Sequence, residues 1–198
     1  YLAKNQIDII HAHTRVTQVL AWFLARKFKI PLLTTCHGFF KPRWHRQLFP
    51  CWGDKTIAIS SQVKEHLMRE FQIKEKDIFL IHNGIDLEKI KSSGTEDIEN
   101  LKNDLGINKV SFVVGTAARF SSVKGLEFLV KSLPEVLKAK SNVILLLVGQ
   151  GREEAKLRRI SKDLKMENKV IFFSPAKETY HYLGAMDIFV MPSIQEGL

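Results

Sequence analysis

Short apolar runs alternate with helix-like stretches along the whole chain, and this rhythm restricts the fold more than any other feature. The runs read IDII, IPLLTTC, TIAIS and DIFLI in the first half, then VSFVV, VILLLV, VIFF and DIFVM in the second. Continuous apolar strands separated by helices are typical of parallel sheets with helices on both faces. The expected helices cover residues 15–28, 61–71, 125–139, 151–164 and 178–186. The sequence therefore predicts an α/β fold of doubly wound parallel sheets.

A polar, turn-rich stretch, KSSGTEDIENLKNDLGINK, separates the two halves. A short amphipathic helix that begins near Thr95 is expected within it, because threonine caps helices well. We interpret residues 1–92 and 107–198 as two α/β lobes, joined by a linker of residues 93–106 that carries this helix. The space between two such lobes is the natural ligand site.

Composition excludes several classes of protein. The chain has 198 residues, of which 45% are hydrophobic and 26% charged, as in ordinary globular domains. No apolar run approaches the roughly 18 residues of a membrane span, and no signal peptide is visible, so a cytoplasmic location is expected. Cys36 and Cys51 lack the spacing of a disulfide framework or zinc ribbon. Because the chain begins with Tyr1 and ends at Leu198 without a closing helix, we interpret it as a fragment.

The positive charge is concentrated at the start of the chain. The formal net charge is +9, and residues 1–50 hold eight basic side chains against one acidic. Such asymmetry indicates an anionic partner, which the residues leave open as a phosphate ligand, an acidic membrane surface or nucleic acid, or else a solvated basic face. The segment FFKPRWHRQLFPCW interleaves aromatic and basic residues, which fits a membrane interface or a nucleic-acid stacking surface. Alternatively, its aromatic rings point inward.

Two cations stand on a loop of small residues, GTAARFSSVKG, between an apolar run and a helix. Arg119 and Lys124 at such a helix start are suited to a diphosphate, and ligands of parallel sheets bind beyond the carboxyl ends of the strands. The loop lacks the G-K-[ST] of a P-loop, which disfavours nucleotide hydrolysis. The alternative reading is two solvated surface cations.

Histidines and glycines at other strand ends are less specific. His11 and His13 share a face and, with His37, could imitate a metal triad, but no ligand has diagnostic spacing and no metal is predicted. In LLLVGQG the third glycine of a dinucleotide fingerprint is replaced by Glu154. A nicotinamide enzyme is therefore not expected, and the two glycines are interpreted as a tight turn with positive φ.

Taken in order, these motifs resemble retaining GT-B glycosyltransferases of the glycogen-synthase-like and mannosyltransferase type, the glycosyl transferases group 1. DIIHAHT, TTCHG, AISSQVKEHL and IHNGID are similar to the later part of the family's acceptor lobe. GTAARFSSVKG, LLLVGQG, VIFFSP and MDIFVMPSIQEGL are similar to the first half of its donor lobe. The resemblance implies two Rossmann-like doubly wound lobes, both incomplete in this chain.

The resemblance also implies roles for single residues. Arg119 and Lys124 match the donor diphosphate clamp, Glu196 matches the first acid of the pair at the donor sugar, and His37 matches a catalytic histidine near the transferred sugar. Weaker matches to the cleft are His13, Ser174, Pro175 and Gly197. The chain departs from the family in having Ala118 before the clamp arginine and in lacking both the second acid and the N-terminal glycine-rich loop.

The activity implied is transfer of a sugar from a nucleoside-diphosphate sugar to a glycan or lipid-linked acceptor, with retention, in envelope polysaccharide or lipopolysaccharide biosynthesis. Fixed cations stabilise the leaving diphosphate, so no metal or other cofactor is required. The enzyme is expected in the cytoplasm, either free or peripheral at the inner face of an anionic membrane, with no nucleic acid as partner. This chain alone is expected to be inactive. The alternatives are a nucleotide-sugar epimerase on the same fold and a non-catalytic nucleotide-sugar-binding fragment.

Overall fold

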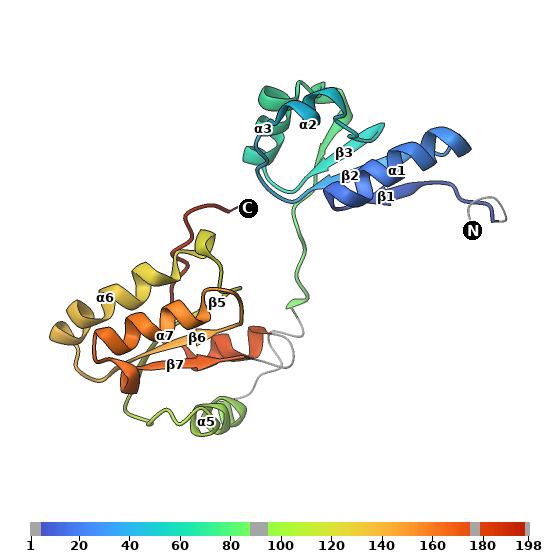
Figure 1. Cartoon of the computed structure of the whole chain (residues 1–198). Helices are drawn as coiled ribbons and strands as arrows, with labels where there is room; N and C mark the ends of the chain where they lie inside the picture. The colour runs from blue at the N-terminus through green and yellow to red at the C-terminus, as the bar shows by residue number, and fades with distance from the viewer. Residues whose placement is uncertain (1–4, 88–94, 175–178, 197–198) are drawn as a thin grey trace. The chain divides into compact units, whose positions relative to one another are not determined.

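The computed structural model describes residues 5–87, 95–174 and 179–196. The chain divides into two compact units, one of residues 1–84 with 196–198 and the other of residues 85–195. Among the described residues, each unit contains one four-stranded parallel sheet (Figure 1). The α/β class predicted from the alternation of apolar runs and helices is confirmed.

The first unit has strands in the order β1-β2-β3-β4, which is also their order along the chain. Its elements are β1 (Ile10–Ala12), α1 (Arg15–Phe28), β2 (Leu32–Cys36), α2 (Trp44–Leu48), β3 (Lys55–Ala58), α3 (Ser61–Phe71), η1 (Glu75–Asp77) and β4 (Ile78–Leu80). Thr14 closes a capping box at the start of α1, and the Ser60 hydroxyl accepts from the Val63 amide at the start of α3. The helices predicted over residues 15–28 and 61–71 are therefore confirmed.

Both long helices of this unit pack on one face of its sheet. Leu32 and Cys36 point to the same side of β2, and Leu32 lies in a core cluster with α1 while Cys36 lies in one with α3. The opposite face carries Phe79 and Ile81, which are 49% and 53% exposed. The sequence predicts helices on both faces, but right-handed crossovers that always step in the same direction put every helix on one side. The described helices of this unit follow that rule.

In the second unit, the chain reverses the direction in which it adds strands to the sheet. Its strand order is β7-β6-β5-β8, so the chain steps from β5 outward to β7 and then returns to pair β8 with the other edge of β5. Its elements are α5 (Thr95–Asp104), β5 (Phe112–Ala117), η2 (Ser122–Lys124), α6 (Leu126–Ala139), β6 (Val143–Val148), α7 (Glu154–Asp163), η3 (Glu167–Lys169), β7 (Val170–Phe173), η4 (Thr179–Ala185) and β8 (Ile188–Phe189). The helix predicted over residues 178–186 is present as η4, which is a 3-10 helix.

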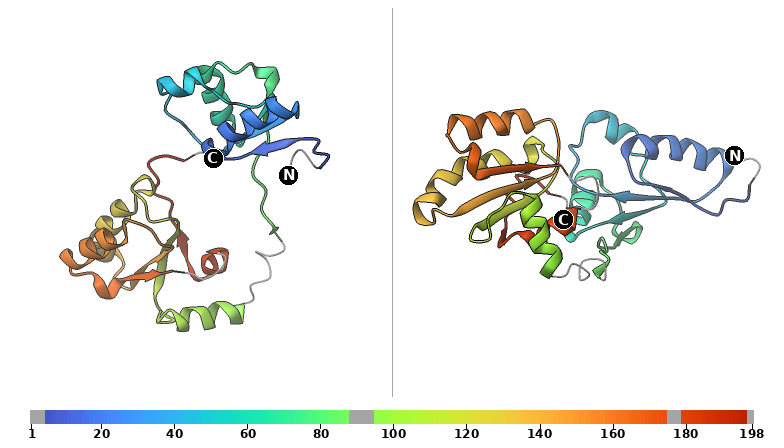
Figure 2. Two further views of the ribbon diagram at one scale, coloured as in Figure 1. Left: turned by 45° about the vertical axis from the view of Figure 1, so that its right-hand side comes forward. Right: turned by 90° about the horizontal axis from the view of Figure 1, so that it is seen from below.

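Both faces of the second sheet are covered, because the crossover from β7 to β8 places Ala185 of η4 on the face opposite α6 and α7. Leu145 and Leu147 lie in a core cluster with residues of α6 and α7, whereas Leu146 and Val148 lie in another with Leu105, next to α5. Figure 2 shows α5 on the side of the sheet away from α6 and α7. The helix predicted within the linker therefore packs onto this sheet. The reversal also creates a topological switch point between β5 and β8, and ligands of open α/β sheets bind beyond the carboxyl strand ends at such a point.

Candidate functional site

Two loops meet at the switch point of the second unit. Residues 118–125 follow β5 and residues 190–195 follow β8. The backbone N–H of Ile194 donates to the Val123 carbonyl at 2.8 Å. A Cβ on Gly125, whose φ is +62°, would lie 2.1 Å from the Pro192 carbonyl oxygen. Only glycine allows this approach, and the two loops are consequently held as one surface.

A third loop closes against the first. The Phe120 backbone N–H donates to the Gln150 carbonyl at 3.0 Å, and the Phe120 side chain is buried beneath the loops. A Cβ on Gly149 would lie 2.0 Å from the Ala118 carbonyl oxygen, and the φ of Gly149 is +143°. The positive φ predicted for this turn is present. The larger reason for glycine, which the sequence did not reveal, is the close approach of two loops that follow neighbouring strands.

The predicted donor residues lie on or beside these loops. Arg119 is exposed and Lys124 is half-buried in η2, and α6 begins directly after them with Gly125 at its N-cap. Two cations next to the N-terminus of a 14-residue helix form a positive site of the kind that binds phosphate groups. Ser174 lies at the end of β7, where its hydroxyl donates to the Gln150 side-chain oxygen at 3.3 Å.

Three of the predicted site residues in the second half of the chain remain to be placed, namely Glu196, Pro175 and Gly197. Glu196 is half-buried and follows the 190–195 loop in sequence. Pro175 and Gly197 lie outside the described residues.

Three histidines gather at the carboxyl ends of β1 and β2 in the first unit. Nδ1 of His13 is joined by a hydrogen bond of 3.1 Å to Nε2 of His37. The rings of His11 and His13 lie 4.1 Å apart between centroids, and Nε2 of His11 is hydrogen-bonded to the Thr35 hydroxyl at 2.8 Å. The expectation that His11 and His13 share a face is confirmed. The sequence did not predict that His13 would contact His37 directly.

The environment of this cluster favours the neutral imidazole at His11 and at His37. Partial burial lowers the pKa of both His11 and His37, and the neighbouring His13 lowers each of them further. Within the described part of the chain, no group of three or more His, Cys, Asp and Glu side chains is arranged to hold a metal ion. A neutral imidazole both donates and accepts hydrogen bonds, so the cluster is suited to hydroxyl groups.

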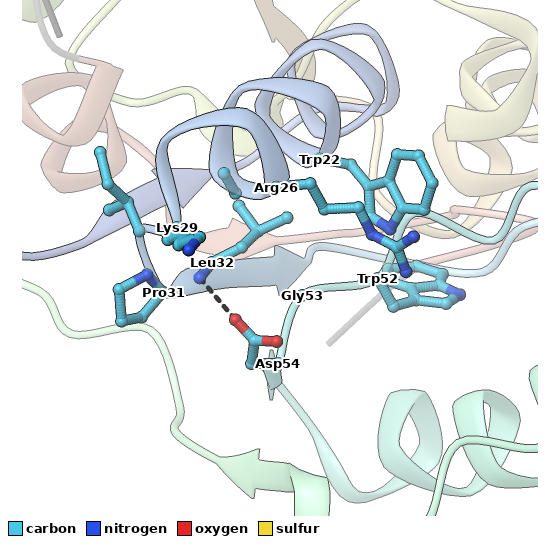
Figure 3. A pocket seen from close by; sticks show the side chains of 10 residues that line it. Trp22, Arg26, Lys29, Pro31, Leu32, Trp52, Gly53 and Asp54 are labelled. Carbon is cyan, nitrogen blue, oxygen red and sulfur yellow. Dashed lines mark hydrogen bonds between the residues drawn. The ribbon is translucent and has the colours of Figure 1, made fainter. Parts of the chain in front are cut away.

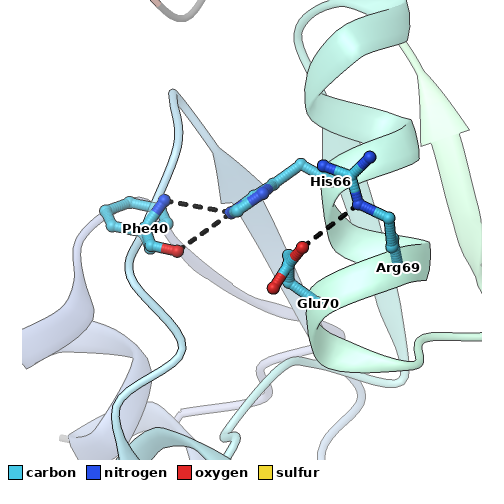
Figure 4. Close-up of polar contacts among 4 residues, drawn as sticks. All are labelled: Phe40, His66, Arg69 and Glu70. Carbon is cyan, nitrogen blue, oxygen red and sulfur yellow. Dashed lines mark hydrogen bonds and ion pairs between the residues drawn. The ribbon is translucent and has the colours of Figure 1, made fainter.

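The segment after His37 is fixed to α3. Burial raises the pKa of Cys36 to about 11, and its thiol donates to the Gly38 carbonyl at 3.2 Å. Two residues further, the Phe40 backbone N–H donates to Nε2 of His66 on α3 at 3.1 Å (Figure 4). Sequence reasoning missed His66, although it occurs within AISSQVKEHL. Its spacing of three residues from the apolar Val63 within the predicted helix is a signal that could have found it, and in the structure His66 is half-buried.

The aromatic and basic segment divides into an inner and an outer part. Phe39 and Phe40 pack against the core of the first unit, whereas Trp44, Leu48 and Phe49 are 73%, 66% and 58% exposed. Neither reading of this segment from the sequence therefore holds for all of it. In the described residues, no helix has both the length and the apolar character needed to cross a membrane.

Known proteins resemble this chain in sequence and in fold. The sequence profile described as Glycosyltransferase Family 4 matches residues 1–89, and that described as Glycosyl transferases group 1 matches residues 97–198. The GDP-mannose-dependent monoacylated alpha-(1-6)-phosphatidylinositol monomannoside mannosyltransferase of Corynebacterium glutamicum is 30% identical over 148 residues, which cover 71% of this chain and 38% of that protein. The UDP-Gal:alpha-D-GlcNAc-diphosphoundecaprenol alpha-1,3-galactosyltransferase of Escherichia coli is 25% identical over 213 residues, covering 100% and 54%.

The fold also matches that of solved glycosyltransferases. Anabaena HepE in complex with UDP-glucose superimposes with a TM-score of 0.82 at 23% identity, covering 94% of this chain and 53% of HepE. The GT-B fold inferred from the motifs is thereby confirmed. The chain spans about half the length of the relatives that it matches along its whole length.

Proposed function

The chain belongs to the glycosyl transferases group 1 family, and from this we propose that the whole protein transfers a sugar from a nucleoside-diphosphate sugar to a glycan or lipid-linked acceptor. The observation that carries the proposal is the pair of cations, Arg119 and Lys124, on a loop at the topological switch point of the second sheet. A diphosphate leaving group develops negative charge as the glycosidic bond breaks, and fixed cations there stabilise it. Such a site requires no metal for that purpose.

The other matched residues would complete the reaction. We assign Glu196 to the donor sugar and His37, oriented by the hydrogen bond to His13, to hydroxyl groups near the transferred sugar. Ser174, with Pro175 beyond it, would meet the base of the nucleotide. We further propose retention of the anomeric configuration, which follows from the family resemblance described above.

A lipid-linked acceptor is favoured by the names of the relatives. One is a mannosyltransferase acting on a phosphatidylinositol monomannoside, one a galactosyltransferase acting on a diphosphoundecaprenol, and a third, at 26% identity, is the alpha-monoglucosyldiacylglycerol synthase of Streptococcus pneumoniae. In this chain, Trp44, Leu48 and Phe49 are exposed beside the basic residues Lys41 and Arg43. We propose that this surface docks on the anionic inner face of a membrane, where the protein builds envelope polysaccharide or lipopolysaccharide.

An acceptor-dependence experiment tests the function. The whole protein is incubated with a panel of nucleotide sugars, with and without lipid extract, and free nucleoside diphosphate and the anomer of the product are measured. Diphosphate release that requires the extract, with the anomer retained, is the expected result. Conversion of the donor sugar without any acceptor would instead indicate an epimerase. Nucleotide binding without turnover under every condition would indicate a non-catalytic binding protein.

A further inference from the structure

A hollow of about 440 Å³ lies at the amino end of the first sheet, and none of the candidate site residues described above lines it. It is lined by the last turns of α1, the turn into β2 and the residues before β3 (Figure 3). Leu32, which opens β2, belongs to it, whereas His37 follows the other end of that strand. At about 3.3 Å per residue, the five residues of β2 separate the two places by about 16 Å.

The crossover between β2 and β3 explains the hollow. A parallel crossover normally contributes a helix that covers the strands it connects. Here the crossover forms only the five-residue α2, Trp44–Leu48, so the space beside α1 over the start of β2 is left for loop residues. Gly53 in that loop is required, because a Cβ on it would lie 2.2 Å from the Leu32 carbonyl oxygen. The volume falls in the range of about 300–1,000 Å³ that small-molecule sites occupy.

The lining combines aromatic rings with charges of both signs. Trp22 and Trp52 are half-buried, and the Arg26 guanidinium lies 3.9 Å from the centre of the Trp22 ring. Lys29 is exposed at the C-cap of α1. The Asp54 carboxylate is exposed, and one of its oxygens accepts a hydrogen bond of 2.8 Å from the Leu32 backbone N–H (Figure 3).

The two signs of charge select the ligand chemistry. A polyanion would be attracted by Arg26 and Lys29 but repelled by Asp54, and a cationic ligand would meet the reverse conflict. Sugar hydroxyls resolve it, since each hydroxyl donates to a carboxylate and accepts from an ammonium or guanidinium group. The apolar face of a pyranose ring packs on an indole, and Trp52 supplies that flat apolar area, because the Arg26 guanidinium already lies over the Trp22 ring. We propose that this hollow binds a sugar unit of a saccharide chain.

The hollow gives the first unit a second binding site for a glycan. The inference rests on the proposed function only for the identity of that glycan. The glycan would be the acceptor, and the hollow would bind one of its sugars that is remote from the sugar being extended. Binding in the hollow itself requires no transfer. A loss of transfer activity and a loss of saccharide binding are therefore separate results.

Indole N–H resonances in two-dimensional NMR spectra test the proposal directly. The three tryptophans of the sequence, Trp22, Trp44 and Trp52, are assigned by single substitution to phenylalanine. Cellobiose, maltose and mannobiose are each titrated to about 50 mM, well above the millimolar dissociation constants of weak binding, with inorganic phosphate as the anionic comparison. At least one disaccharide should shift Trp22 and Trp52 and leave Trp44 unmoved. No shift with any disaccharide, or equal shifts with phosphate, overturns the proposal.

Two mild variants separate recognition from folding. Arg26→Gln and Asp54→Asn should each weaken disaccharide binding by about tenfold, as expected when a hydrogen bond to a charged group is lost. Lys27→Gln is the matched control, because Lys27 is an exposed neighbour on α1 that does not line the hollow. It should bind as the unchanged protein does. Equal weakening by Lys27→Gln and Arg26→Gln would mean that net charge alone acts, and the sugar site would be rejected.

Discussion

Nδ1 of His13 and Nε2 of His37 lie 3.1 Å apart and are joined by a hydrogen bond that links the ends of β1 and β2. If both rings were protonated, two N–H groups would face each other, so the bond requires at least one neutral imidazole. The pair consequently carries at most one positive charge while the bond is intact. This geometry agrees with the direction of the pKa shift at His37.

The first prediction concerns the pKa of His37. Burial, and then His13, lower the pKa of His37 below the ordinary value of about 6.5. The unfolded chain therefore binds more protons than the folded chain between the two pKa values. The neutral His37 ring therefore contributes to the stability of the folded chain. This contribution is fully present above about pH 6.5 and is lost as the pH falls through the folded-state pKa. In His13→Gln, the His37 pKa should rise while remaining below 6.5, because burial persists.

NMR titration of the imidazole ring protons measures this shift. His82→Gln is the matched control, since His82 bonds to the Ile59 carbonyl at 3.0 Å and is not among the groups that shift the pKa of His37. A His37 pKa at or above 6.5 in the unchanged protein would show that the cluster does not favour the neutral ring.

The second prediction concerns the diphosphate site. Arg119→Ala and Lys124→Ala should each weaken binding of a nucleoside diphosphate by about 1.5–3 kcal/mol, the range for hydrogen bonds to charged groups. Titration calorimetry of the whole protein measures this loss. Lys138→Ala is the control, because Lys138 is an exposed cation in the last turn of α6 that pairs with Glu135. Unchanged affinity in both loop variants would remove the basis of the proposed donor site.

The third prediction separates a steric contact from backbone strain. Gly125 and Gly106 have similar φ values, +62° and +68°, but a Cβ on Gly125 meets the Pro192 carbonyl at 2.1 Å whereas nothing lies within 4 Å of one on Gly106. Gly106→Ala should cost only the left-handed conformation, about 1–2 kcal/mol. Gly125→Ala should cost about 1–3 kcal/mol more, as overpacking does. Urea unfolding compares the two, and equal losses would mean that the loops separate freely.

The fourth prediction concerns membrane docking. Lys41→Glu with Arg43→Glu should reduce co-sedimentation with anionic liposomes at low salt, since each cation near such a surface contributes about 1 kcal/mol. Arg46 is left unchanged because it is half-buried and lies 4.5 Å over the Phe40 ring. Lys74→Glu with Lys76→Glu changes the charge equally and serves as control. Binding should weaken as salt shortens the Debye length to about 8 Å. No preference of the unchanged protein for anionic over neutral lipid would favour a soluble acceptor.

Strands and long helices could be predicted from sequence because their signals are local. The run VILLLV predicts the buried strand β6, and the spacing of apolar residues in LEFLVKSLPEVL predicts α6. Strand order was not accessible in the same way. The two residues of β8 carry too little pattern to indicate that they return to pair with β5. Without that return, the switch point beside Arg119 and Lys124 cannot be located.

The site residues were found as types at strand ends, but their contacts were not. Pairing of His13 with His37 depends on the register that sets His11 of β1 opposite Leu33 of β2. Likewise, the requirement for glycine at position 125 comes from Pro192, a residue that is distant in sequence. Such contacts are set by tertiary packing, which a single sequence does not display.

The contact between Gly125 and Pro192 makes the two loops of the second unit inseparable in protein engineering. A grafting experiment that moves residues 118–125 from another member of the family into this chain also imports a requirement on the carbonyl position at residue 192. If the recipient keeps its own residues 190–195, the backbone hydrogen bond between Val123 and Ile194 and the tight approach at Gly125 must re-form by chance. The unit of exchange in such a graft is therefore the pair of loops, which must be moved together.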